Sequence, residues 1–85
     1  MLDHGATTDA RNNRGWTPLH DAAFYGYPEV ARLLIDSGAE VDARENAGWT
    51  SLHMASQEGH IDVVRALLEH AAEPDARTDT QLTPL

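Results

Sequence analysis

The segment GWTPLHDAA at residues 15–23 recurs almost unchanged as GWTSLHMAS at residues 48–56, thirty-three residues later. When residues 15–44 are aligned with residues 48–77, fifteen of the thirty positions are identical. Identity at this level over a fixed period indicates an internal structural repeat.

The register of this repeat extends to both ends of the chain. LDHGATTDAR at residues 2–11 resembles IDSGAEVDAR at 35–44, and LTPL at 82–85 resembles WTPL at 16–19. We therefore predict two whole units between the tail of a preceding unit and the head of a following one. The predicted boundaries are residues 1–11, 12–44, 45–77 and 78–85.

The first half of each unit carries the signals of a short helix. Thr17 is a favourable N-cap, and Pro18 suits the first helical position because its missing N–H is not needed there. Gly26 supplies the left-handed residue that ends such a helix. Thr50 and Gly59 stand at the equivalent places of the second unit and predict the same helix there.

The second half of each unit predicts a second helix. Pro28 opens it in the first unit and Gly38 closes it. Apolar residues recur at helical spacing within both second helices and predict a stripe that faces the core. These residues are Val30, Leu33 and Leu34 in the first unit and Val63, Val64, Leu67 and Leu68 in the second.

The combination of Gly-x-Thr-Pro-Leu-His, Ala-Ala, Gly, an apolar second helix and Gly-Ala at a 33-residue period resembles the ankyrin repeat. The resemblance covers essentially the whole chain. It implies an all-α solenoid of antiparallel helix pairs, with β-hairpin or turn fingers projecting to one side. It also implies that His20 and His53 are structural hydrogen-bonding residues near the starts of the first helices.

Composition restricts the class of protein. The 85 residues carry a net charge of -8, with six arginines, no lysine and no cysteine. A field of this sign repels phosphate groups, so we expect neither nucleic acid nor a membrane surface as a partner. With no long apolar segment, we expect one soluble domain, with the cytoplasm or nucleus favoured as its location.

The five histidines do not predict a metal or catalytic site. Equivalent residues on packed helices lie about 8–10 Å apart, whereas two imidazoles on one zinc each bind at about 2.0–2.1 Å. His20 and His53 are equivalent in this sense, so they should not converge on one ion. The serines lack the base and acid that a nucleophile needs. We therefore expect no enzyme activity, metal or cofactor.

The family resemblance implies that another protein binds on the concave face formed by the fingers and first helices. Both tryptophans and the single phenylalanine fall at variable positions of this face, as binding hot spots favour. An alternative is that the two tryptophans pack sideways and brace the fingers. The candidate binding positions are Asn13, Arg14, Trp16, Phe24, Tyr25, Arg44, Asn46, Ala47, Trp49, Gln57, Glu58 and Arg77.

Arginines also recur at the repeat period, each two residues after an aspartate. On extended finger arms, residues i and i+2 face the same way, so this pattern favours a surface charge ladder over direct partner contact. The ladder comprises Arg11, Arg44 and Arg77, with Asp9, Asp42 and Asp75.

The ends of the chain suggest an alternative function. Solenoids commonly need about three repeats and polar outer faces, whereas here partial units stand at both ends. We therefore also expect that copies of the chain could associate through their terminal stacking faces, as a filament or a closed dimer. In that case the protein is a self-associating scaffold element.

Overall fold

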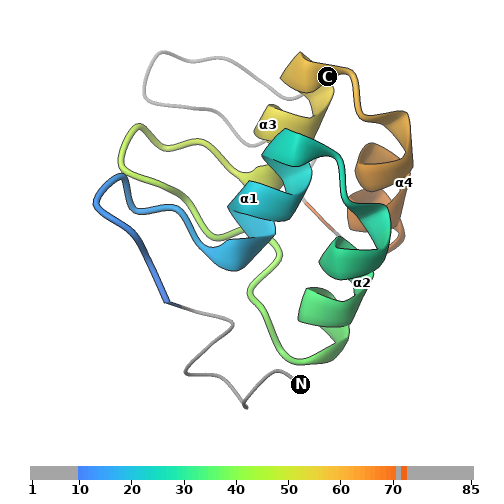
Figure 1. The fold of residues 1–85 in the computed structure, drawn as a ribbon, viewed down its shortest axis with the longest axis horizontal. Coiled ribbons are helices and arrows are strands. Elements are labelled where there is room, and N and C mark those ends of the chain that lie inside the picture. Colours follow the sequence, from blue (N-terminus) through green and yellow to red (C-terminus); the bar gives the residue numbers. More distant parts are fainter. Residues whose placement is uncertain (1–9, 71, 73–85) are drawn as a thin grey trace.

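The computed structural model describes residues 10–70 and 72, and this part of the chain is all-helical. Helices α1 and α3 lie side by side in one layer, and α2 and α4 form a second layer packed against them, on the right in Figure 1. The loops that precede α1 and α3 project from the side of the first layer. The bounds are α1 (Pro18–Tyr25), α2 (Pro28–Asp36), α3 (Ser51–Glu58) and α4 (Ile61–Glu69).

Reciprocal hydrogen bonds start the first helix of each unit. The Thr17 hydroxyl accepts the backbone N–H of His20 at 3.3 Å, and the Thr17 N–H donates to Nδ1 of His20 at 3.0 Å. Thr50 and His53 repeat this arrangement at 3.3 and 3.1 Å. Each pair is a capping box in which histidine takes the place of the usual glutamate.

Left-handed glycines end both first helices, as the sequence predicts. Gly26 has φ +79° and Gly59 has φ +75°. A Cβ at Gly26 would also lie 2.6 Å from Nδ1 of His60, whereas a Cβ at Gly59 would meet open space. Gly26 is therefore required both by its backbone conformation and by a close approach between the repeats.

Small side chains let the two first helices approach each other. Ala22 and Ala23 on α1 and Ala55 on α3 are fully or almost fully buried. Leu19 and Leu52 complete the packing around them. Because the alanines add little thickness, α1 and α3 can pack closely against each other where these residues meet.

The predicted apolar stripe of α2 is partly wrong. Leu34 is buried, but Val30 is 47% and Leu33 56% exposed. The equivalent of Val30 is Val63 on α4, which is fully buried. Val63 belongs to the buried core cluster, whereas Val30, one repeat earlier, does not. The core therefore uses Ala31 and Leu34 from α2 instead.

Each projecting finger is a tight turn closed by hydrogen bonds. In the first, Asn12 N–H donates to the Trp16 carbonyl at 3.0 Å, and the Asn12 side chain accepts the N–H of Trp16 at 3.0 Å. In the second, the Glu45 N–H donates to the Trp49 carbonyl at 2.9 Å, and the Glu45 carboxylate accepts the Trp49 N–H at 3.0 Å. A side-chain acceptor at the same position thus shapes both turns.

The two fingers also bond to each other. Asn46 donates its backbone N–H to the Arg14 carbonyl at 3.0 Å and its side-chain amide to the Asn13 carbonyl at 3.1 Å. The Arg11 guanidinium donates to the Arg44 carbonyl, thirty-three residues away. The predicted fingers are therefore present as turns, held in register across the repeat boundary.

Candidate functional site

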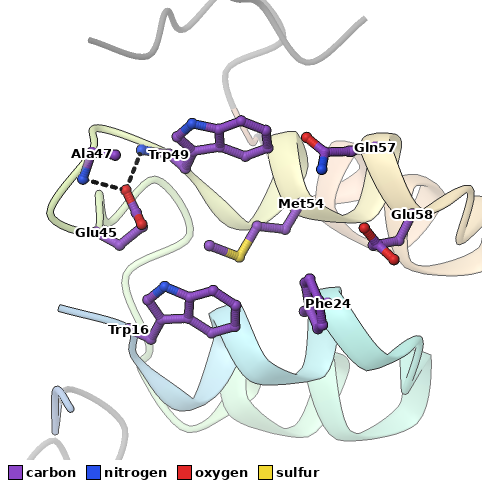
Figure 2. Close-up of a pocket in the computed structure, with 8 residues that line it drawn as sticks. All are labelled: Trp16, Phe24, Glu45, Ala47, Trp49, Met54, Gln57 and Glu58. Atoms are coloured by element: carbon purple, nitrogen blue, oxygen red, sulfur yellow. Dashed lines mark hydrogen bonds between the residues drawn. The ribbon is translucent and has the colours of Figure 1, made fainter. Parts of the chain in front are cut away.

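A groove of about 210 Å³ lies between the second finger and the first-layer helices α1 and α3 (Figure 2). Its walls come from both repeats, so neither unit alone would form it. The residues that line it are Trp16, Phe24, Glu45, Ala47, Trp49, Met54, Gln57 and Glu58.

Aromatic packing along α1 fixes one wall. The ring centroid of Trp16 lies 5.3 Å from that of Phe24 with the planes at 58°, and 6.4 Å from that of His20. His20 and Phe24 are one turn apart on the same side of α1, and Trp16 directly precedes the N-cap of this helix. Trp16 and Phe24 also pack against the buried core. Ring contacts with α1 and packing against the core therefore hold this wall in place.

Hydrogen bonds of the second finger fix the opposite wall. The ring of Trp49 lies 5.7 Å from that of His53. The Glu45 carboxylate accepts the backbone N–H groups of Ala47 and Trp49. The Trp49 carbonyl is also bonded to Nε2 of His20 at 2.9 Å, across the repeat boundary. The position of Trp49 therefore depends on both units.

The groove has an apolar floor and an acidic rim. Met54, only 4% exposed, extends its thioether between the two indoles (Figure 2). Gln57 and Glu58 lie exposed at the end of α3. Glu45 and Glu58 are the charged residues among those that line the groove. The site therefore combines aromatic faces with negative charge.

The structure brings together only part of the predicted binding set. Six of the predicted residues line the groove: Trp16, Phe24, Ala47, Trp49, Gln57 and Glu58. Asn13, Arg14 and Asn46 lie in the fingers, Arg44 bonds to the Gly48 carbonyl, and Tyr25 packs edge-on against Phe24 beside Tyr27. Arg77 lies outside the described residues. A partner-binding role for all of these positions stays a prediction.

Sequence reasoning missed Glu45 and Met54. Glu45 stands where the preceding unit has Asn12, and both residue types can accept hydrogen bonds from backbone N–H groups nearby in the chain. This equivalence could have predicted the role of Glu45 in the second finger. Met54 stands where the preceding unit has the exposed Asp21. Its spacing from Gln57 and Glu58, one turn along α3, places it on their side of the helix.

The positions of the two tryptophans fit both roles that the sequence left open, bracing of the fingers and partner binding, and the second role stays a prediction. Each is half-buried and packs against the core, and each exposes part of its ring in the groove. Bracing and partner binding are therefore compatible at Trp16 and Trp49.

His20 is a buried structural group. Its Nδ1 accepts the Thr17 N–H, so Nε2 carries the proton that is donated to the Trp49 carbonyl. Burial lowers the pKa of His20, and the bond to Trp49 opposes that shift. His60 likewise bonds through Nε2 to the Phe24 carbonyl at 3.0 Å. Both imidazoles therefore join the repeats.

The arginines at the repeat period contact main-chain carbonyls. Arg11 donates to the carbonyls of Gly15 and Arg44, and Arg44 donates to that of Gly48. These bonds tie the finger arms together. Of the predicted ladder, Asp9, Asp75 and Arg77 lie outside the described residues, and the pairing of Asp42 with Arg44 stays a prediction.

Two further features are absent from residues 10–70 and 72. This part of the chain holds no group of three or more histidine, cysteine, aspartate or glutamate side chains placed to bind a metal ion. None of its helices combines the length and the apolar character needed to cross a lipid bilayer.

Comparison with known proteins agrees with this architecture. A family model for ankyrin repeats, in three copies, matches residues 1–78. Protein phosphatase 1 regulatory subunit 27 from Homo sapiens is 49% identical over 35 residues, and the protein of the same name from Mus musculus gives the same figures. The match covers 41% of this chain and 23% of each relative. Because the family model matches most of the length of this chain, the chain belongs to the ankyrin-repeat family.

Proposed function

We propose that this chain is a non-catalytic protein-interaction module that binds a partner protein in the groove between Trp16 and Trp49. Ankyrin repeats are generally protein-interaction modules. The human and mouse relatives are named as regulatory subunits, which fits binding rather than catalysis. The similarity covers too little of those relatives to carry their partner over to this chain.

The aromatic lining of the groove supports this choice of face. Trp16, Trp49 and Phe24 expose ring surface there, around the flexible thioether of Met54. Aromatic residues dominate binding hot spots, where truncation costs about 2 kcal/mol or more. Because hydrogen bonds and ring contacts already hold both walls, little further ordering is needed when a partner side chain enters.

A selection experiment can test this face without removing core residues. The full chain is panned against a phage-displayed library of random dodecapeptides, and selected clones are retested on Ala47→Arg. Position 47 is equivalent to Arg14 in the first unit, so the fold already accepts arginine there. The new guanidinium would cover the groove beside Trp49. Ala10→Arg, an exposed alanine outside the groove, is the matched control.

We expect clones that bind the unmodified chain and Ala10→Arg equally and lose most of their binding to Ala47→Arg. A Trp16→Ala, Trp49→Ala double variant, shown to be folded by circular dichroism, should lose the same clones. Selected clones that bind Ala47→Arg and the double variant undiminished would refute the proposed face, and so would a library that yields no groove-dependent clone.

A second candidate function is self-association through the stacking faces. Val30 and Leu33 are exposed apolar residues on α2. On α4, Ile61 is 63% and Leu68 39% exposed, beside the half-buried Val64. Stacking one of these faces on the other would extend the solenoid. Light scattering over a concentration series separates the candidates, because a monomer at every concentration would refute self-association.

A further inference from the structure

We infer that the groove recognises an arginine side chain of its partner, with the stem between the two indoles and the guanidinium directed to Glu58. This inference deepens the proposed function and depends on it. The partner segment is therefore basic, and the arginine rather than a purely apolar residue is its anchor.

The aromatic lining suits a flat cation. Arginine stacks on tryptophan and phenylalanine faces and is attracted by their ring quadrupoles within about 6 Å. The chain itself shows such a contact beside the groove, where Cζ of Arg14 lies 5.9 Å from the ring centroid of Trp16. Trp49, at the equivalent place of the second unit, has Ala47 in the position of that arginine.

The charge of the lining also favours a cation. Glu45 and Glu58 contribute negative charge, and no basic residue is among the described residues that line the groove. Glu45 already accepts two finger N–H groups through its Oε1. Glu58 is exposed, and among residues 10–70 and 72 no ion pair joins it to a basic side chain. Within the described residues, Glu58 is therefore the lining carboxylate without a hydrogen bond or ion pair, and it is the one to which the cation is assigned.

The size of the groove limits the occupant to one side chain. Its volume of about 210 Å³ is below the range of about 300–1,000 Å³ that is usual for whole small-molecule ligands. Trp16 and Trp49 bound it near the finger, while Phe24 and Glu58 lie at the far ends of α1 and α3 (Figure 2). A long side chain with an apolar stem and a charged head matches this order of surfaces.

Synthetic peptides can separate the effect of the arginine charge on affinity from the effect of the side chain's shape. One groove-dependent dodecapeptide from the phage selection is synthesised with arginine at its anchor position and again with citrulline, which is a neutral isostere of arginine. Affinities of both are measured by fluorescence polarisation for the full chain, Glu58→Gln and Glu29→Gln. Glu29 is an exposed acid on α2, outside the groove, and serves as the matched control.

We expect citrulline to weaken binding by about tenfold, as the loss of one desolvated cation contact implies. Glu58→Gln should weaken the arginine peptide several-fold and leave the citrulline peptide almost unchanged, while Glu29→Gln should affect neither. This non-additivity would place the guanidinium at Glu58.

Two results would overturn the inference while leaving the proposed function intact. One is a set of groove-dependent clones that contain no arginine, and the other is equal binding of the arginine and citrulline peptides. A lysine peptide that binds as tightly as the arginine peptide would overturn the choice of a guanidinium. If no clone depends on the groove, both the inference and the proposed function fail.

Discussion

Replacing His20 by alanine measures how strongly one buried side chain holds the two repeats together. The imidazole is fully buried and contacts three groups: the N–H of Thr17 at 3.0 Å, the hydroxyl of Thr17 at 2.9 Å and the carbonyl of Trp49 at 2.9 Å. Alanine removes all three contacts at once. It also takes from the buried Thr17 N–H its acceptor, while the Trp49 carbonyl keeps the N–H of Glu45.

The expected cost follows from these contacts. Each buried hydrogen bond contributes about 0.5–1.5 kcal/mol net, and a buried polar group left unpaired costs about 1–3 kcal/mol. We therefore expect His20→Ala to lower the free energy of unfolding by about 3–4 kcal/mol. A chain of this length has about 4–13 kcal/mol in total, so the variant would lose a large part of its stability.

Urea denaturation followed by far-ultraviolet circular dichroism provides the measurement. With a slope of about 1–3 kcal/mol per molar, the midpoint should fall by about 1 M or more. His70→Ala is the control, because its side chain makes no hydrogen bond to another described residue and should cost less than about 0.5 kcal/mol. Equal midpoints for the two variants would refute the structural role assigned to His20.

Three further predictions concern the same scaffold. Because burial lowers the pKa of His20 below 6.5, the unfolded chain takes up a proton first as the pH falls. The contribution of His20 to the free energy of unfolding is therefore complete above about pH 6.5 and decreases below that pH. Denaturation at neutral pH and about pH 5.5 should show a larger loss for the unmodified chain than for His20→Gln, and equal losses would contradict this. Gly26→Ala should destabilise the fold by more than the roughly 1–2 kcal/mol that a left-handed alanine costs, because the new Cβ would meet His60. Gly59→Ala should cost only that amount, because its Cβ would meet open space. Equal shifts in melting temperature for the two variants would contradict the contact with His60. Thr50→Ala removes an N-cap and should cost about 1–2 kcal/mol in urea denaturation, and an unchanged midpoint would show that this cap contributes nothing.

Local features of the sequence were sufficient to predict the helices. Thr17 and Thr50 cap them, and Gly26 and Gly59 end them, through contacts within a few residues. Such contacts depend on the chain nearby and not on what packs against it. The sequence also indicated Trp16 as a candidate binding position, and the structure places it in the lining of the groove.

Features that depend on a neighbouring repeat were harder to predict. Val30 and Val63 are the same residue at the same repeat position, yet only Val63 has a described repeat packed over it. Met54 and Asp21 are also equivalent, and only Met54 lies in the groove between two units. The bond from His20 to Trp49 joins residues 29 positions apart. Internal periodicity alone does not reveal which face of a unit is covered.

The hydrogen bond from His20 to the Trp49 carbonyl couples the shape of the groove to the packing of the two repeats against each other. One indole comes from each repeat, so a guest molecule bound between the indoles contacts both repeats. It must dissociate before the repeats can separate. A guest present at a hundred times its dissociation constant would add about 2.7 kcal/mol to the free energy of unfolding. A rise in melting temperature therefore offers a label-free way to screen mixtures of candidate guests, whatever their chemical identity.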